Sequence, residues 1–376
     1  MTDRWALGLS QLWLRILFLL LGLRAQPALV RVGDWKMNMD MKTIRKTARD
    51  KLKGYCRVCP VCDGRACSGE VPGMGGVGSG KSFRANLEAL AAYRLRMRTI
   101  HGVKEPVTAM QILGQDISMP LLAAPMTGTT YNMGGKLTEE EFISHIVEGS
   151  IEAETLAFTG DGADPAMFDS GIKAIQNNAG RGIAIIKPRS QKEIVSRIRA
   201  AEKAGVACVG VDIDGAGLIT MARMGQAVGP KSVHEIRELV ESTELPFVLK
   251  GIMTPEDAFC AMEAGASAIV VSNHGGRVLD STIGAAKVLP EIAAMVRGRM
   301  LVLADGGVRF GADVLKLLAL GADAVLLGRP LIVGAFGAGK KGVSLIFRKV
   351  ADELIQAMLL TGTSSVTMVN PGIVER

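Results

Sequence analysis

The sequence predicts a (β/α)8 TIM barrel with an N-terminal cysteine-rich extension, and three observations carry this prediction. Glycine accounts for 45 of the 376 residues and 48% of residues are hydrophobic, but only 4% are aromatic, which favours small-residue α/β packing. From Pro106 onward, short apolar runs alternate with longer helical patterns, as in repeated βα units. About eight such runs occur, as a closed barrel requires. We therefore expect residues 106–376 to form the barrel and residues 37–105 to form a helical, Cys- and Gly-rich lead-in.

The predicted strands are nearly continuous in hydrophobicity, as expected of parallel strands buried on both faces. This property, repeated along the chain, fits a closed barrel better than an open doubly wound sheet. The eight runs are Leu121–Ala124, Thr155–Phe158, Ile183–Ile186, Cys208–Asp212, Phe247–Lys250, Ala268–Ser272, Leu301–Ala304 and Ala324–Leu327.

Helical patterns follow several of these strands, as the βα repeat requires. Clear examples are Gln191–Ala204, Pro255–Ala264 and Gly311–Ala319. The one long segment without clear periodicity, Gly215–Val233, is predicted to be a loop over the active-site face.

The first 36 residues are set apart as an N-terminal apolar extension. Residues 5–32 are apolar, but Arg15 and Arg24 interrupt them, and no clean run approaches the roughly 20 residues of a membrane span. A signal peptide is one alternative. Another is a start codon assigned too early, because methionines such as Met37 precede a basic helical stretch at Thr43–Lys53. We favour the second and expect a cytoplasmic protein, with a targeting or membrane-surface role for residues 1–36 left open.

The formal charge of +7 does not indicate a nucleic-acid partner. Lys and Arg are spread along the chain, without long basic runs or interleaved aromatic residues. The excess positive charge is better explained by general solubility and one or two anion sites.

Polar and glycine residues follow four successive predicted strands where each strand ends. Lys250 closes the fifth strand, His274 and Arg277 follow the sixth, Asp305-Gly306-Gly307 follows the seventh, and Gly328-Arg329 follows the eighth. Barrels of this type build their active sites at the C-terminal ends of the strands. We therefore expect these side chains to share one site.

The glycines after the last two strands predict a phosphate site. This is the usual phosphate-binding corner of such barrels, where backbone amides approach the anion. Arg309 and Arg329 would add bidentate contacts. The alternative is that these glycines are plain turn residues.

His274 is the candidate general base. It is flanked by glycines that admit a ligand, with Arg277 nearby for an anionic substrate and a lysine on the neighbouring strand. The other histidines, His101, His145 and His234, lack such company and are expected to be structural or exposed.

These motifs resemble those of the FMN-dependent α-hydroxy-acid oxidising family, which includes glycolate oxidase, lactate oxidase and flavin-linked lactate dehydrogenase. Ser272–Asp280 is similar to the family signature, and Leu249–Ile252, Asp305–Arg309 and Leu327–Pro330 are similar to its cofactor motifs. The resemblance spans roughly residues 119–330 and is strongest after Pro246. It implies FMN as the cofactor and a homotetramer.

The resemblance also implies a role for each matching residue. His274 would take the proton from the substrate, Arg277 would bind its carboxylate, and Lys250 would stabilise the reduced flavin. Asp212 would orient His274 and stabilise its charge. The residues expected to bind FMN are Ala124, Pro125, Met126, Thr127, Lys250, Ser272, Asp305, Gly307, Arg309, Gly328 and Arg329.

The substrate pocket departs from the family pattern. The third strand, Ile183–Ile186, lacks the tyrosine that the family usually places there, and Asp212 is followed by Ile213-Asp214 in place of a Thr-Pro pair. Only Arg223 is near enough in sequence to replace the second carboxylate-binding arginine. The N-terminal tyrosine of the family has no evident counterpart except Tyr55, within the cysteine-rich segment.

Four cysteines lie in one short segment, Cys56, Cys59, Cys62 and Cys67, whereas Cys208 and Cys260 are isolated and expected in the core. The spacing suits an iron–sulfur cluster or a structural zinc, with unmetallated thiols as the remaining alternative. Such crowding is typical of a reducing compartment. A cluster beside a flavin would exchange single electrons with an external partner.

We predict an enzyme that oxidises a 2-hydroxy acid, lactate- or glycolate-like, to the 2-keto acid. The expected partners are a small-molecule carboxylate and a protein or quinone electron acceptor. The alternatives are an FMN-dependent isomerase, an oxidoreductase acting on another substrate, and a non-catalytic flavin or metal sensor. The His274-Gly-Gly-Arg element argues against an isomerase, and the intact Lys250 and Arg277 argue against a sensor.

Overall fold

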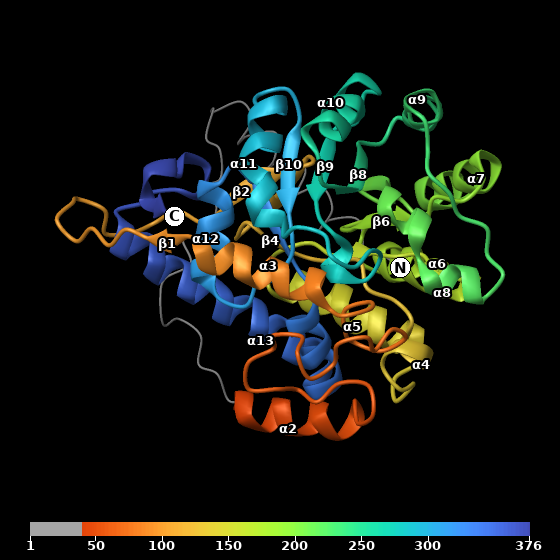
Figure 1. Ribbon diagram of the computed structural model, residues 1–376, viewed down its shortest axis with the longest axis horizontal. Helices are drawn as coiled ribbons and strands as arrows, with labels where there is room; N and C mark the ends of the chain where they lie inside the picture. The colour runs from red at the N-terminus through yellow and green to blue at the C-terminus, as the bar shows by residue number, and fades with distance from the viewer. Residues whose placement is uncertain (1–39) are drawn as a thin grey trace, which may run out of the picture.

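Eight parallel strands form the centre of the structure, a computed structural model that describes residues 40–376 (Figure 1). Their spatial order is β4-β11-β10-β9-β8-β7-β6-β5. Ala123 of β4 pairs in parallel with Ala157 just before β5, and the Ala123 amide donates to the Leu156 carbonyl at 3.0 Å. These contacts join the two ends of the sheet, so it closes into a barrel.

The barrel strands are short and almost wholly buried, because helices cover their outer face and side chains fill the interior. Their bounds are β4 Leu121–Ala123, β5 Phe158–Thr159, β6 Ile183–Ile186, β7 Cys208–Asp212, β8 Phe247–Ile252, β9 Ala268–Val271, β10 Leu301–Ala304 and β11 Ala324–Leu327.

The helices that alternate with the strands lie outside the barrel. Three of them begin with a capping box. In each, the side chain of a Ser or Thr accepts from the backbone N–H of a Glu three residues later, and that Glu side chain accepts from the backbone N–H of the Ser or Thr. The outer helices are α5 Glu139–Glu152, α6 Pro165–Asn177, α7 Gln191–Lys203, α9 Val233–Glu241, α10 Pro255–Glu263, α11 Ala285–Val296, α12 Gly311–Ala319 and α13 Arg329–Thr361.

The last helix, α13, has 33 residues and kinks at Ala338 and Gly339. By length and apolar composition alone it could cross a membrane, but 61% of its most apolar window is buried inside the protein. It packs against α5 and against α2, Met41–Lys51. These contacts are those of a core helix in a barrel.

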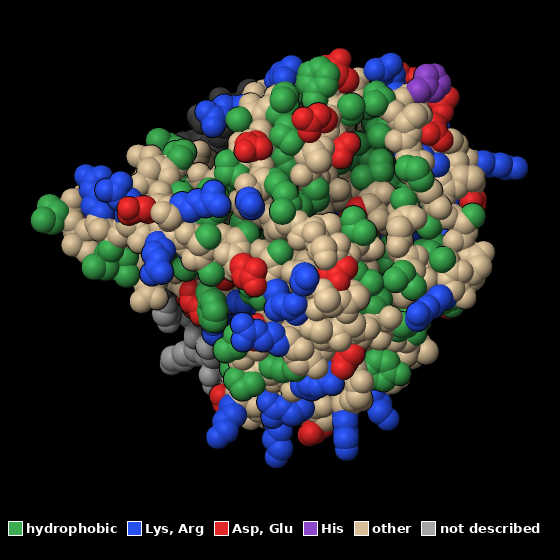
Figure 2. Space-filling model, viewed as in Figure 1, with side chains coloured by type: hydrophobic (Ala, Val, Ile, Leu, Met, Phe, Trp, Pro, Cys, Tyr) green, Lys and Arg blue, Asp and Glu red, His purple; other side chains and the backbone are tan. Residues whose placement is uncertain are grey.

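The lead-in wraps the barrel from its base to its C-terminal rim. Helix α2 lies against α13, and α3, Lys81–Ala92, packs against α11 (Figure 1). Between them runs a loop whose Val77 amide donates to the Gly276 carbonyl at 2.8 Å. Figure 2 shows Lys and Arg side chains along the lower edge of the molecule, over α2. The loop and the first turns of α3 both reach the active-site end, where Asn86 Nδ2 donates to Asn273 Oδ1 at 2.7 Å.

Short elements complete the fold away from the site. A hairpin is formed by β2, Met110–Ile112, and β3, Gln115–Ile117. Near the C-terminus β12, Val374–Glu375, pairs with β1, Arg94–Leu95, and so ties the chain end to the lead-in.

The predicted barrel and the positions of its strands are confirmed. Four strands have the predicted bounds, namely β6, β7, β10 and β11. The second strand differs: its ladder is limited to Phe158–Thr159, although Leu156 and Ala157 are buried beside β4. The predicted lead-in helix begins two residues earlier, because Asp40 caps α2.

The prediction of an unbroken loop at Gly215–Val233 was wrong in part. The segment contains the end of a 3-10 turn, Ile213–Gly217, and a short helix α8, Ile219–Arg223. Its place over the active-site face is confirmed, because Leu218, Thr220 and Met221 line the pocket there. The prediction about residues 1–36 lies outside the described residues.

Candidate active site

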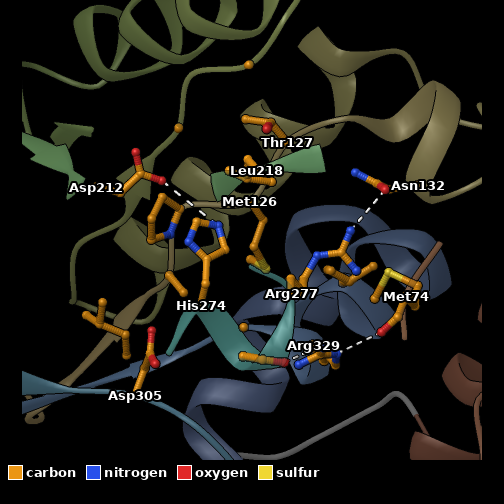
Figure 3. Close-up of a pocket in the computed structure, with 18 of the residues that line it drawn as sticks. Met74, Met126, Thr127, Asn132, Asp212, Leu218, His274, Arg277, Asp305 and Arg329 are labelled. Atoms are coloured by element: carbon orange, nitrogen blue, oxygen red, sulfur yellow. Dashed lines mark hydrogen bonds and ion pairs between the residues drawn. The ribbon is translucent and has the colours of Figure 1, made fainter. Parts of the chain in front are cut away.

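The C-terminal ends of the strands surround one pocket, which contains most of the predicted site residues (Figure 3). Among the predicted residues that line it are Ala124, Pro125, Met126, Thr127, Asp212, Lys250, His274, Arg277, Asp305, Gly307, Arg309, Gly328 and Arg329. Ser272 lies directly beneath it, fully buried, and accepts hydrogen bonds from Lys250 Nζ at 3.1 Å and from the His274 amide at 3.0 Å.

His274 follows β9 and has a positive φ of 57°. Gly275 and Gly276 after it also have positive φ, so the backbone turns sharply and the imidazole points into the pocket. His274 Nδ1 lies 3.0 Å from Asp214 Oδ1, whereas Nε2 lies 4.0 Å from Asp212 Oδ2. Nδ1 is therefore the engaged nitrogen, and Nε2 is left for a substrate.

The electrostatic balance at His274 favours the neutral ring. Burial lowers its pKa, Asp214 raises it, and Lys250 lowers it, with a net shift below the ordinary value. Burial also acts on Asp214 by raising its pKa, but His274 and Lys250 outweigh it and bring the pKa to about 2. The pair is therefore a carboxylate beside a neutral imidazole that can accept a proton.

Asp214 was missed by the sequence analysis, which gave the orienting role to Asp212. The Asp212 carboxylate instead forms a buried ion pair with Lys187. Asp214 reaches His274 because Gly251 leaves room: a Cβ at Gly251 would lie 2.4 Å from Asp214 Cγ. The prediction for Asp212 is corrected accordingly, since it lines the pocket but is not the closer partner of His274.

Lys250 of β8 is a buried cation that lines the pocket. Its Nζ lies 3.9 Å from Asp305 Oδ2. Burial lowers its pKa, but Asp214 and Asp305 outweigh this and the net shift is upward. A fixed positive charge thus lies next to the pocket, where an electron-rich ligand would be stabilised.

Arg277 lies in the pocket, but its guanidinium is engaged by the lead-in. Nη1 donates to the carbonyls of Gly73 at 2.6 Å and Gly75 at 3.1 Å, and Nη2 donates to Asn132 Oδ1 at 3.0 Å (Figure 3). Burial lowers the pKa of Arg277 to about 10, so it stays cationic at neutral pH. A substrate carboxylate would compete with these carbonyl oxygens for the same N–H groups.

The corner after β10 and β11 fits a phosphate group. Gly307 has a φ of 84°, and a Cβ there would lie 3.0 Å from the backbone of Asn86, so only glycine suits this turn. Asp305 Oδ1 and Arg309 Nε are buried without a hydrogen-bond partner among the described residues. Unpaired buried groups of this kind indicate that a polar ligand completes the site.

Arg329 is the second arginine of this corner. It stacks over the Phe83 ring at 4.0 Å and donates to the carbonyls of Met74 at 3.0 Å and Gly275 at 3.1 Å. The pKa of Arg329 is lowered to about 9, mainly by burial and also by the positive charge of the neighbouring Arg277. The positive charges of Arg277 and Arg309 both act on Arg329, and guanidinium groups gathered in this way favour a bound anion.

Tyr131 and Asn132 in the short helix α4, Thr129–Asn132, line the pocket and were not predicted. Burial raises the pKa of Tyr131 to about 12, with Arg277 acting in the opposite direction. Tyr131 thus places a phenol near Arg277, where Ala184 of β6 offers none. No strand periodicity leads to α4, which explains why the sequence analysis overlooked it.

Two predicted substitutes do not lie in the pocket. Arg223 is exposed at the end of α8 and is not among the lining residues. Tyr55 packs against Gly134 and is also absent from the lining. Neither residue replaces the missing family groups.

The four cysteines lie on the loop between α2 and α3, all partly buried and unpaired by disulfides. Within the described residues, the one group of three ligand atoms within 4.8 Å of one another is Asp212, Asp214 and His274. The thiols are therefore near one another without forming a ligand set. Burial raises the pKa values of Cys56 and Cys67. Their metal-binding role remains a prediction.

The run Gly75–Ser82 has the spacing of a Walker A loop, but its structure does not match one. It precedes α3 without following a strand. The amides of Ser79 and Lys81 donate to the Asp280 carboxylate at 2.6 and 3.1 Å. An internal carboxylate thus takes the place that a nucleotide phosphate would need.

Comparison with known proteins identifies a matching family and several similar chains. A family model described as FMN-dependent dehydrogenase matches residues 73–231 and 220–376. A 2-hydroxyacid oxidase of Dictyostelium discoideum is 31% identical over 322 residues, covering 77% of this chain and 81% of that protein. An L-lactate oxidase of Lactobacillus jensenii is 31% identical over 317 residues, covering 76% of each. A crystal structure of mandelate oxidase superposes with a TM-score of 0.72 at 28% identity, covering 89% of this chain and 97% of that one.

Proposed function

Because the chain belongs to the FMN-dependent dehydrogenase family, we propose that it oxidises a small 2-hydroxy acid to the 2-keto acid, with His274 as the base. The observation that carries the proposal is the His274–Asp214 pair at 3.0 Å, beside the buried Lys250. The pocket therefore holds both a neutral base, His274, and a fixed cation, Lys250.

The residues present fit FMN. Gly307, Gly328, Arg309 and Arg329 would hold its phosphate, since glycine backbone amides can approach the anion and Arg309 Nε has no hydrogen-bond partner among the described residues. Ala124–Thr127 after β4 would lie along its ring. When bound, FMN supplies an acceptor for the two electrons that leave the substrate.

His274 would accept the substrate proton at Nε2, because Nδ1 is held by Asp214. The Asp214 carboxylate then stabilises the imidazolium that results, as a fixed negative charge 3.0 Å from Nδ1. Asp214 keeps the same charge throughout, since its pKa is about 2. The pair therefore moves one proton without burying an uncompensated charge.

Arg277 would bind the substrate carboxylate in exchange for contacts to Gly73 and Gly75. For this exchange, either the backbone at Gly73 and Gly75 moves away from Arg277, or the carboxylate binds a guanidinium N–H that these carbonyls leave free. Tyr131 would add a hydroxyl on the same side. Lys250 would stabilise negative charge on the ring of the cofactor.

Finer features are proposed as well. The four cysteines would bind either an iron–sulfur cluster or zinc, an idea that their spacing supports. The acceptor of the electrons would be a protein or a quinone, and the chain would form a cytoplasmic homotetramer. Metal analysis, assays with and without oxygen, and light scattering test these features one at a time.

The purified protein tests the main proposal. It should be yellow, with about one FMN per chain released on denaturation. Under anaerobic conditions, a member of a panel of 2-hydroxy acids should bleach the flavin absorbance, and the matching 2-keto acid should accumulate. A colourless protein that does not take up added FMN would overturn the proposal.

A further inference from the structure

The cysteine segment, residues 56–67, lies beside the phosphate corner of the pocket. Arg309 Nη2 donates to the Cys62 carbonyl at 3.1 Å and lies 3.5 Å from Cys62 Sγ. The charge of Arg329 acts on Cys56, Cys62 and Cys67. The two arginines expected to hold the flavin phosphate thus also act on the thiols of the segment.

The backbone of the segment favours a sulfur ligand at its first cysteine. The Val58 amide donates to Cys56 Sγ at 3.4 Å, which requires Val58 to adopt a positive φ of 46°. Such a conformation is costly for a β-branched residue and persists only where the surroundings fix it. Here it aims a backbone N–H at a thiol two residues earlier.

The segment is held firmly at both ends by contacts that involve no cysteine side chain. Arg45 Nη2 donates to the Val58 and Cys59 carbonyls at 3.2 and 2.5 Å. Arg57 and Glu70 form a bidentate ion pair with both distances 2.7 Å. These contacts tie the start of the segment to α2 and to Glu70.

Positive charge surrounds the thiols. Arg45, Arg49, Arg309 and Arg329 all contact the segment or act on its cysteines. Four cysteine thiolates around iron and sulfide carry net negative charge, and nearby cations offset it. The spacing, with two residues between the first three cysteines, is close to that of ferredoxin-type runs.

We propose that Cys56, Cys59, Cys62 and Cys67 ligate an iron–sulfur cluster that carries electrons from the flavin site to a one-electron carrier protein. The inference rests on the proposed function, which supplies the electrons. Oxidation of one 2-hydroxy acid releases two electrons and two protons. The electrons leave one at a time through the cluster, each reducing one carrier molecule, and the protons leave to solvent.

The test uses the full chain, purified without oxygen. Iron, acid-labile sulfide and zinc are measured per chain, and the dithionite-reduced protein is examined by electron paramagnetic resonance. We expect about four irons and four sulfides and a signal from a reduced cluster. Cys59→Ser and Cys67→Ser, tested separately in case one fails to fold, should lose both. Cys260→Ser on α10, outside the segment, should keep both.

Three results would overturn the inference. One is a single zinc without sulfide, and another is a protein that stays free of iron after anaerobic reconstitution with iron and sulfide. The third is iron that survives in both segment variants. Anaerobic bleaching of the flavin by 2-hydroxy acids is read on the same samples. Bleaching without a cluster sinks only this inference, whereas a cluster without bleaching sinks the proposed function.

Discussion

His274 Nδ1 lies 3.0 Å from Asp214 Oδ1, and the two residues are 60 positions apart in sequence. The contact joins the turn after β9 to the 3-10 turn after β7. It fixes which imidazole nitrogen faces the pocket and supplies the charge that an imidazolium needs.

Asp214→Asn should slow substrate oxidation by roughly 10- to 150-fold, because a charge-assisted hydrogen bond worth roughly 1.5–3 kcal/mol is lost in the transition state. Asp214 raises the pKa of His274, so its loss should also move the acid limb of the pH profile to lower pH. Asp212→Asn, which breaks the Lys187 pair, is the comparison. An acid limb that stays in place in Asp214→Asn would show that Asp214 does not act through His274.

The wild-type profile of kcat/KM should have its acid limb below pH about 6.5, the ordinary value for histidine. Burial and Lys250 lower the pKa of His274 below that value, so the free enzyme keeps a neutral base into mildly acid solution. The measurement is kcat/KM against pH for one 2-hydroxy acid. A limb well above that value would mean that another group titrates.

Acid should also destabilise the fold through His274. Since its folded pKa lies below the unfolded value of about 6.5, the unfolded chain binds more protons in that window, and stability falls as pH drops below about 6.5. The free energy of unfolding of His274→Asn should fall less over the same range. Equilibrium urea unfolding at pH values on both sides of the window measures the difference, and equal slopes would contradict it.

Arg277→Lys should raise KM for the substrate, because a single ammonium cannot replace a planar guanidinium at a carboxylate. The loss should be on the order of tenfold or more in kcat/KM. The FMN content should stay unchanged. Initial rates over a range of substrate concentrations measure the effect. Unaltered saturation behaviour would place the carboxylate elsewhere in the pocket.

Gly307→Ala should weaken FMN retention. The residue has a φ of 84°, and its added Cβ would lie 3.0 Å from Asn86 and beside the phosphate corner. Gly205→Ala is the matched control, since Gly205 has a φ of 72° but no atom within 4 Å of an added Cβ. In both variants, backbone strain should lower the free energy of unfolding by about 1–3 kcal/mol. Only Gly307→Ala should lose FMN during gel filtration. Equal FMN contents would argue against this corner as the phosphate site.

The sequence predicted the barrel well because its evidence is local. Buried parallel strands such as β7 and β10 are continuous apolar runs that end at or just before an aspartate, and their bounds followed directly. The strand β5 was less well placed, because Leu156 and Ala157 are as apolar as the ladder residues that follow them.

The site residues that the sequence missed depend on contacts between distant segments. Asp214 was overlooked because Asp212, two residues earlier, ends the strand and looked equivalent. The engagement of Arg277 by Gly73 joins residues 204 positions apart, which no local pattern encodes. Tyr131 lies in a four-residue helix without periodicity. Residue types at strand ends were predictable, but their pairing was not.

The most direct test of the account is the anaerobic reduction of bound FMN by a 2-hydroxy acid, followed in a stopped-flow instrument for the wild type and for His274→Ala. The wild type should bleach rapidly. His274→Ala should keep its FMN but bleach about 10²- to 10⁴-fold more slowly, the usual contribution of a general base. Bleaching at the wild-type rate in the variant, with FMN bound, would show that His274 is not the base.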